Sequence, residues 1–258
     1  MRQLPAIRRD KLTEDDNPVF LLKSMRQEYL KSTIRLGRFC FNHPKVFNEW
    51  EKQDAAQYDK WDSYAAFRIT RAVADPNVDK DTGIPDLKTG IQLKAEGEIH
   101  FQSELISHTP VCCFRCIRRK EIEVVDGKMF FSLGKTANRI ETEFGHDSYI
   151  IVPIKPFLEL IESKGYSFCG MEVVYCDALN EDPFHPLSGR DKMLAEQIFR
   201  KDKSFEWQSE YRICLAPTNE SPVFLNIGSI ENIAVYGRMK SLETKRCIYR
   251  CDQSESEE

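Results

Sequence analysis

The stretch that decides the fold runs from Gln208 to Leu215 and reads Gln-Ser-Glu-Tyr-Arg-Ile-Cys-Leu. Its apolar run, Tyr211 to Leu215, predicts a strand that Glu210 opens. Side chains along a strand alternate with a period of two, so Gln208 and Glu210 are expected on one face. That face offers a carboxylate for a sugar hydroxyl beside an amide for a second substrate. The pattern indicates chemistry at a ribose; the alternative is a surface strand on which Glu210 pairs with Arg212 or a lysine.

The composition is that of an ordinary soluble globular chain of 258 residues, 41% of them hydrophobic and 30% charged. A chain of this length can bury a substantial core. The 16 Phe and 9 Tyr favour a fold rich in sheet, because aromatic side chains suit half-buried pleated surfaces. A formal net charge of −4 argues against a protein that coats nucleic acid.

Several features predict a cytoplasmic protein that binds no membrane. No apolar run approaches the roughly 20 residues of a membrane-spanning helix, and residues 1–10 lack the apolar centre of a signal peptide. The 9 cysteines, irregularly spaced, favour reduced thiols over a disulfide framework. Cys113 and Cys116 have the spacing of zinc ligands, but no second Cys-x-x-Cys pair accompanies them, so no metal is expected.

The chain divides into a polar N-terminal arm, a single α+β domain and an acidic tail, predicted at residues 1–17, 18–251 and 252–258. Ser24 is the expected N-cap of the first helix, and Gly37 is expected to end it. Clusters of Pro, Gly and charged residues predict two long loops, at residues 75–97 and 177–189. Helices are predicted at residues 24–34, 50–72, 156–164 and 191–201.

Strand patterns crowd the later part of the chain, which favours the α+β class. The dipeptide Asp126-Gly127 is a strong signal for a hairpin turn between two of these strands. Strands are predicted at residues 19–22, 38–42, 98–101, 110–118, 121–125, 128–132, 149–152, 168–176, 210–215, 223–226, 230–236 and 247–249.

An early and a late motif resemble those of a poorly characterised bacterial and phage family. The early motif is Phe-Asn-Glu-Trp-Glu at residues 47–51, and the late one is Gln-x-Glu-x-Arg at residues 208–212. A middle stretch, Val-Cys-Cys-Phe at residues 111–114, is similar to a strand of that family. The chain departs from the family at Glu49-Trp50, where an Asp-Pro pair is usual. Because members often lie near phage-defence genes, the resemblance implies a toxin or defence effector.

The chain more distantly resembles ADP-ribosyltransferases, through the Gln-x-Glu element. That resemblance implies a split, mostly antiparallel sheet flanked by helices, with NAD as substrate and a catalytic Glu at the start of a late strand. Glu210 would bind the ribose 2′-hydroxyl and face the cationic transition state, as hydroxyl contacts do in glycoside hydrolysis. Gln208 would orient the acceptor, a macromolecule that the sequence leaves open between protein and nucleic acid.

The same resemblance implies further contacts to NAD. A cation on the first strand would grip the dinucleotide, and the candidates are Lys23 and, one turn later, Arg26. A hydroxyl and an aromatic ring would contact the ribose; Ser132 with Thr136, or Ser148 with Tyr149, are the candidate pairs.

Other readings of the chain stay open. It is alternatively a non-catalytic binding protein that keeps the transferase scaffold. A metal-dependent nuclease is a third alternative, because Asp126 and Lys128 fit the end of a nuclease motif. The basic cluster Arg115, Arg118, Arg119 and Lys120 is either a phosphate-binding surface or a solvated strand end.

Overall fold

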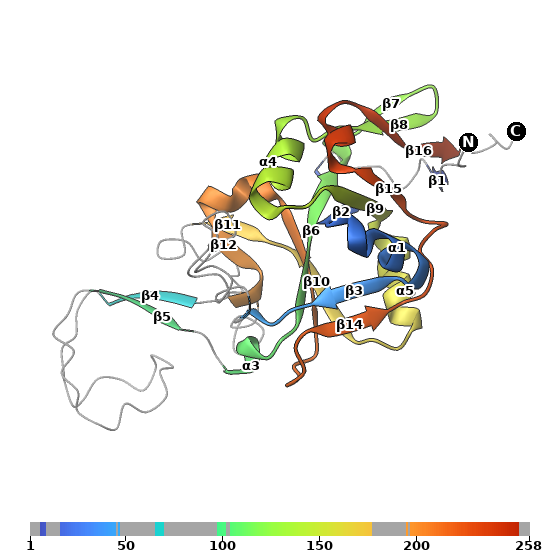
Figure 1. The fold of residues 1–258 in the computed structure, drawn as a ribbon. Helices are drawn as coiled ribbons and strands as arrows, with labels where there is room; N and C mark the ends of the chain where they lie inside the picture. The colour runs from blue at the N-terminus through green and yellow to red at the C-terminus, as the bar shows by residue number, and fades with distance from the viewer. Residues whose placement is uncertain are drawn as a thin grey trace, which may run out of the picture.

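The computed structural model describes residues 6–8, 16–44, 46, 65–69, 97–101, 104–176, 195 and 197–252. It consists of a few short helices and many strands, most of them paired antiparallel (Figure 1). This mixture agrees with the predicted α+β class. Within the described residues the longest helices have 10 residues, and none could cross a membrane.

A six-stranded sheet forms the centre of the fold, and each neighbouring pair in it is antiparallel. Strand β13 therefore lies one position from the edge, between β10 and β6. In spatial order the strands are β10 (Phe168–Glu172), β13 (Glu210–Leu215), β6 (Val111–Arg118), β2 (Pro18–Met25), β9 (Ser148–Pro153) and β15 (Val235–Arg238).

The sheet opens between β2 and β6. Strand β2 pairs with β9 as far as Met25, but with β6 only as far as Leu22. Beyond that point the ammonium of Lys23 donates a hydrogen bond to the carbonyl of Cys113, 2.7 Å away. A lysine side chain thus satisfies a backbone acceptor that a continuous β2–β6 ladder would have used.

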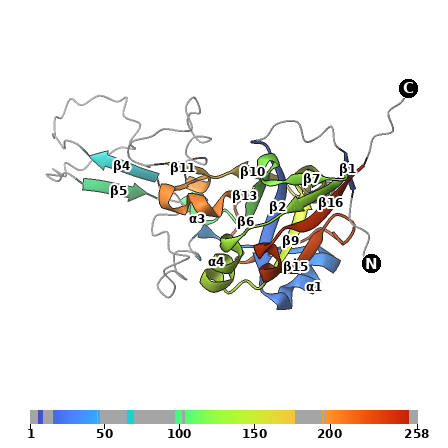
Figure 2. The same ribbon diagram turned by 90° about the horizontal axis from the view of Figure 1, so that it is seen from above.

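Two hydrophobic clusters pack against the two faces of the sheet. Figures 1 and 2 show the helices and strands that contribute to them. On one face lie helices α1 (Gln27–Leu36) and α5 (Ile154–Ser163) and the strand pair β3 (Arg38–Phe41) and β14 (Val223–Asn226). On the other lie α4 (Lys135–Phe144), the 3₁₀ helix η5 (Met239–Glu243) and a second sheet. That sheet has the order β1 (Ala6–Arg8), β16 (Arg246–Asp252), β8 (Lys128–Phe131) and β7 (Glu123–Val125).

The remaining elements are short. Strands β11 and β12 pair in parallel and lead into η4, and β4 pairs with β5. Their bounds, with those of α3 and η3, are β4 (Ala65–Ile69), β5 (Gly97–Phe101), α3 (Glu104–Ser107), η3 (Arg119–Glu121), β11 (Val174–Cys176), β12 (Arg200–Asp202) and η4 (Lys203–Gln208).

The first helix begins later than the sequence predicts. Ser24 is not its N-cap, because β2 continues through Met25 and Arg26 takes the cap position. Gly37 ends the helix as predicted, in the left-handed conformation with φ 57°. A Cβ on Gly37 would lie 2.2 Å from the carbonyl oxygen of Gly228, so the position also needs glycine for space.

Other predictions at element level are partly wrong. The helix predicted at 50–72 contains strand β4, and its other residues lie outside the described ones. The helix predicted at 191–201 ends in strand β12, and the strand predicted at 168–176 breaks between β10 and β11. Only the end of the strand predicted at 230–236 is extended. Tertiary pairing overrides local propensity in these segments.

Several boundary predictions are confirmed. Asp126 and Gly127, with φ 48° and 67°, form the turn between β7 and β8. The remaining predicted strands are found within one to three residues of their predicted limits. Helices α3 and α4, and the 3₁₀ helices η3, η4 and η5 of the described residues, were not predicted from the sequence. Of the expected polar arm, residues 6–8 form β1, while residues 253–258 of the tail lie outside the described part.

Candidate functional site

The candidate site is built where η4 meets β13. The 3₁₀ helix η4 ends at Gln208, and Ser209 adopts a left-handed conformation with φ 47° that turns the chain into β13 at Glu210. Gln208 therefore does not lie on the same strand as Glu210. The alternation of side chains along one strand, which predicted both on one face, does not apply to this pair. The two side chains are nevertheless brought together by a third residue.

That residue is Lys201, on strand β12. Its ammonium donates to the side-chain oxygen of Gln208 at 2.8 Å and to Oε1 of Glu210 at 2.9 Å. It also lies 4.9 Å from the centre of the Phe205 ring, a cation–π contact. A hydrogen-bond donor thus occupies the point where Gln208 and Glu210 converge.

Arg212 holds the other carboxylate oxygen of Glu210. Its Nε donates to Oε2 of Glu210 at 2.8 Å, and its NH1 donates to the carbonyl of Ile198 at 2.7 Å. The side chains of Lys201, Glu210 and Arg212 are only 7%, 11% and 3% exposed. These three residues form a buried ion cluster, and its net charge is +1.

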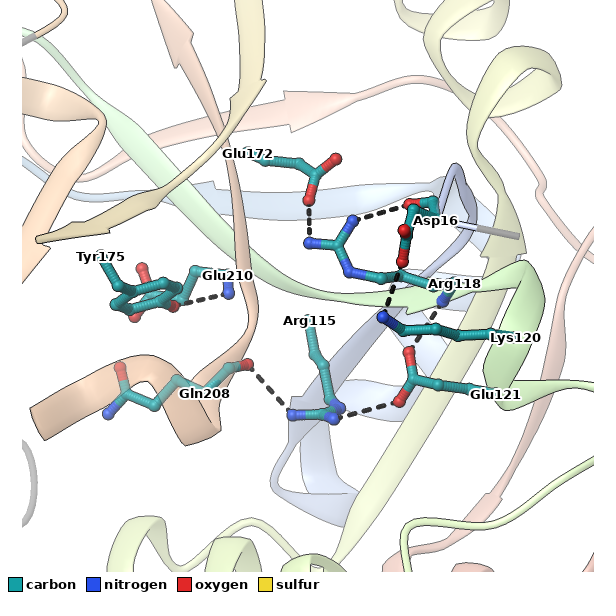
Figure 3. Close-up of polar contacts among 9 residues, drawn as sticks. All are labelled: Asp16, Arg115, Arg118, Lys120, Glu121, Glu172, Tyr175, Gln208 and Glu210. Carbon is teal, nitrogen blue, oxygen red and sulfur yellow. Dashed lines mark hydrogen bonds and ion pairs between the residues drawn. The ribbon is translucent and has the colours of Figure 1, made fainter. Parts of the chain in front are cut away.

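Glu210 is ionised in this cluster. Burial opposes the charged form, but the charges of Arg212 and Lys201 and their hydrogen bonds hold the pKa of Glu210 at about 2. The backbone N–H of Glu210 donates to the hydroxyl of Tyr175 at 2.7 Å (Figure 3). Burial raises the pKa of Tyr175, which is therefore a neutral phenol at pH 7.

Arg115 fixes the end of η4 beside Glu210. Its NH1 donates to the carbonyls of Trp207 and Gln208, at 2.7 and 3.3 Å, and its NH2 pairs with Glu121 at 3.3 Å (Figure 3). Arg115 lies directly opposite Glu210 across β6 and β13. Arg115, one residue of the predicted basic cluster, therefore uses its guanidinium to bind the backbone at the end of η4.

The other residues of the basic cluster also have partners within the chain, and Figure 3 shows those of Arg118 and Lys120. Arg118 pairs with Glu172 and donates to the carbonyl of Asp16, while Lys120 pairs with the Asp16 carboxylate at 2.6 Å. Arg119 donates to the carbonyl of Ile122 at 2.9 Å. Carboxylates within the chain therefore neutralise much of the positive charge of the basic cluster, which was a candidate phosphate-binding surface.

The first-strand candidates lie on the other side of β6. Burial opposes the charged form of Lys23, but neighbouring cysteine side chains and Glu210 raise its pKa above the ordinary value. Glu210 is thus near enough for its charge to act on Lys23, in the opening between β2 and β6. Arg26 is exposed at the start of α1.

A serine–histidine pair beside Lys23 was not predicted from the sequence. Glu210 lies opposite Arg115, and Arg115 opposite Leu22, so Ser24, two residues further along β2, is on the same face as Glu210. The hydroxyl of Ser24 and Nδ1 of His146 are 2.8 Å apart. Burial, with the charges of Lys23 and Arg26, lowers the pKa of His146 to about 4, so its imidazole is neutral at pH 7.

Aromatic contacts connect this pair with the ion cluster. The ring of Trp207, next to Gln208, stacks on Phe144 with centroids 6.0 Å apart, and Phe144 lies 5.9 Å from the His146 ring. The guanidinium of Arg139 covers Trp207 at 3.7 Å. The Trp207 and Phe144 rings therefore form a row that leads from the His146 ring to the end of η4, next to Gln208.

The other predicted ribose contacts lie elsewhere. Tyr149 is 4% exposed and belongs to the core between the sheet and α4, and Ser148 donates to the side chain of Gln27 at 2.6 Å. Ser132 follows β8 and Thr136 lies in the first turn of α4. Among the described residues, none of these four side chains shares a hydrogen bond or an ion pair with Glu210, so their roles in binding stay predictions.

Comparison with other proteins identifies no relative: no protein-family model, curated protein or solved structure matches the chain. In the described part of the chain, no group of three or more His, Cys, Asp or Glu side chains could hold a metal ion. Asp126 and Lys128 lie at the β7–β8 turn, and the early motif at residues 47–51 falls outside the described residues.

Proposed function

We propose that the protein is an ADP-ribosyltransferase-like enzyme that uses NAD as a substrate. The order of its elements supports this assignment, since an N-terminal strand and helix, β2 and α1, precede a sheet that opens between β2 and β6. Glu210 begins the late strand β13, where the resemblance implies the catalytic carboxylate. The motifs that resemble the defence-associated family point to a toxin or phage-defence effector.

The observation that carries the proposal is the position of the Lys201 ammonium between Gln208 and Glu210. The ammonium donates a separate N–H to each side chain, which supports a site where the amide oxygen and the carboxylate face the same bound group. A ribose hydroxyl donates a single hydrogen bond, so the 2′-hydroxyl would take Oε1 of Glu210, and a donor on the acceptor would take the amide oxygen of Gln208. For NAD to bind in this way, Lys201 must leave Oε1 of Glu210, while Arg212 can stay on Oε2.

The chemistry follows from the charge of Glu210. The bond between ribose C1′ and the nicotinamide nitrogen breaks, and its electron pair leaves with nicotinamide. An ionised carboxylate beside the 2′-hydroxyl stabilises the positive charge that develops on the ribose. The acceptor then forms a bond to C1′ and loses its proton, with Gln208 holding the acceptor in position.

Other groups near Glu210 suit the rest of the dinucleotide. Lys23 supplies a positive charge in the β2–β6 opening, complementary to a diphosphate. The neutral His146, held by Ser24, has a ring nitrogen left for a hydroxyl, and the Trp207–Phe144 row offers aromatic surface. Charge, hydrogen-bonding and aromatic groups therefore lie around the β2–β6 opening, where Lys23 extends from the face opposite to Ser24 and packs over Phe114.

Release of nicotinamide from NAD by the purified protein tests the proposal. Wild-type protein is expected to release it, and Glu210→Gln to lose at least a hundredfold in rate. Glu162→Gln, an exposed change on α5, is the matched control and should keep wild-type activity. An active Glu210→Gln variant would refute the assignment of this residue.

The second candidate function is a non-catalytic binding protein on the same scaffold. It is favoured by one observation: each carboxylate oxygen of Glu210 already carries an ion pair, with Lys201 or with Arg212. Two cations beside the carboxylate also disfavour a cationic transition state. Failure of wild-type protein to release nicotinamide, together with measurable NAD binding by calorimetry, would support this function over the transferase.

A further inference from the structure

Two cysteines face each other at the edge of the central sheet. Cys169 on β10 lies directly opposite Cys214 on β13. Val173 N–H donates to the carbonyl of Glu210 at 2.9 Å, so that carbonyl points toward β10. Backbone groups two and four residues further along point the same way, which makes Cys169 and Cys214 a hydrogen-bonded pair. The Cα atoms of such a pair are about 5.5 Å apart, within the roughly 4.4–6.8 Å that a disulfide spans.

The two thiols lie on the same side of the sheet, in different surroundings. Cys214 is 4% exposed and belongs to a small cluster with Ile198 and Phe199, whereas Cys169 is exposed. Burial, and next the neighbouring Cys169, raises the pKa of Cys214 to about 12. Cys169 is therefore the thiol that a solvent oxidant reaches first, with a second thiol beside it.

No other cysteine in the described strands has a cysteine directly opposite. This contrast separates the pair from the remaining thiols, which read as ordinary core or surface residues. The opposed residues are Phe224 for Cys40, Ile213 for Cys112, Arg212 for Cys113, Leu21 for Cys116, Asp202 for Cys176, Phe130 for Cys247 and Ile7 for Cys251.

We propose that Cys169 and Cys214 form a reversible disulfide, with a hydroperoxide as the oxidant. The sulfur of Cys169 attacks the peroxide, giving a sulfenic acid and releasing an alcohol, or water from hydrogen peroxide. The sulfur of Cys214 then attacks the sulfenic sulfur, so that an S–S bond forms and water leaves. A dithiol reductant reverses the reaction by thiol–disulfide exchange.

The position of β10 makes this closure feasible. The Cβ atoms of a hydrogen-bonded pair lie toward the upper end of about 4.5–5.5 Å, more than the roughly 3.5–4.5 Å of a disulfide, so the backbone must adjust locally. Strand β10 ends the order of the six-stranded sheet, so no further strand of that sheet opposes this adjustment. The bond would tie this edge strand to the strand that Glu210 opens, and it does not depend on the proposed transferase activity.

Peptide mapping after oxidation tests the proposal. Folded wild-type protein is treated with hydrogen peroxide, its remaining thiols are alkylated, and it is digested with trypsin without reduction. The expected product joins the peptides 165–190 and 213–238, and fragmentation must place the bond at Cys169 rather than Cys176. Dithiothreitol should separate the two peptides.

Three variants complete the test. Cys169→Ser and Cys214→Ala should each abolish the linked peptide, and Cys40→Ser, an exposed cysteine opposite Phe224, should leave its yield unchanged. Circular dichroism of each protein before oxidation shows whether the fold is intact. The proposal fails if folded wild-type protein oxidises Cys169 only to sulfinic acid, or joins it to a cysteine other than Cys214.

Discussion

Two charged clusters of this protein lie on either side of Arg115, and they differ in burial. In the buried ion cluster, Glu210 is 11% exposed between Lys201 and Arg212. In the outer cluster, Arg118 and Glu172 are each 29% exposed, and Lys120 pairs with Asp16 at 58% and 83% exposure. Water screens the outer charges, whereas each buried charge depends on its protein partners. Charged residues of the buried ion cluster should therefore contribute much more to the free energy of unfolding than those of the outer cluster.

The largest expected decrease in the free energy of unfolding comes from neutralising Glu210 in the buried ion cluster. Glu210→Gln leaves the charges of Lys201 and Arg212 without their carboxylate, which should lower the free energy of unfolding by about 3–5 kcal/mol. Urea denaturation of the variant and of Glu162→Gln measures the difference. A change below about 1 kcal/mol would mean that the cluster is solvated in solution, and the comparison would fail.

Lowering the pH should produce the next largest decrease in the free energy of unfolding. The folded pKa of Glu210, about 2, lies below the unfolded value of about 4.3, so its contribution is fully present above roughly pH 4.5. As the pH falls toward 2 this contribution is lost, and it is on the order of 3 kcal/mol. Urea denaturation between pH 7 and pH 2 should show a loss that is much smaller in Glu210→Gln. Parallel curves for the two proteins would contradict the buried pairing.

Removing the charge of Lys201 should lower the free energy of unfolding less than removing the charge of Glu210. Lys201→Met keeps the aliphatic stem and leaves Glu210 with Arg212, so we expect a loss of about 1.5–3 kcal/mol. The same change frees Oε1 of Glu210 and the Gln208 amide, and under the proposed function nicotinamide release should rise severalfold. Unfolding curves and a nicotinamide assay measure the two effects. A loss of stability equal to that of Glu210→Gln would show that Arg212 does not hold the carboxylate alone.

A substitution in the outer cluster should lower the free energy of unfolding least. Glu172→Gln breaks the pair with Arg118 at a half-exposed position, and the expected loss is about 0–1 kcal/mol. Because salt screens such pairs, the difference from wild type should shrink further in 1 M NaCl. Unfolding at low and high salt measures it. A loss above about 2 kcal/mol that is insensitive to salt would remove the distinction between the two clusters.

Local patterns in the sequence predicted much of the frame of the site. The apolar run after Glu210 is strand β13, Asp126-Gly127 is a hairpin turn, and Gly37 ends a helix. The alternative prediction for the same stretch was a surface strand on which Glu210 pairs with Arg212 or a lysine. The pairing is confirmed with both partners, but the strand is buried, so the surface position was wrong. Such features depend on neighbours within a few residues, so they are visible in the sequence.

Contacts between distant segments could not be predicted in the same way. Ser24 and His146 are 122 residues apart and meet because β2 and β9 are adjacent in the sheet. The placement of Gln208 and Glu210 on one face assumed a continuous strand, and the left-handed Ser209 ends that continuity. Helix α4, which supplies Phe144 and Arg139, has a short apolar face that becomes clear only against its core.

By itself, the sequence determined which residue types were available and where the strand beginning at Glu210 would start, because strand periodicity and turn chemistry are local properties. Only the tertiary structure decided what surrounds Glu210. The approach of β12 brings Lys201 to the carboxylate, and the order β13–β6–β2 places Ser24 on the same face of the sheet as Glu210. Whether a charge is buried or screened depends on packing between distant segments, and that burial gives Glu210 its pKa and its partners.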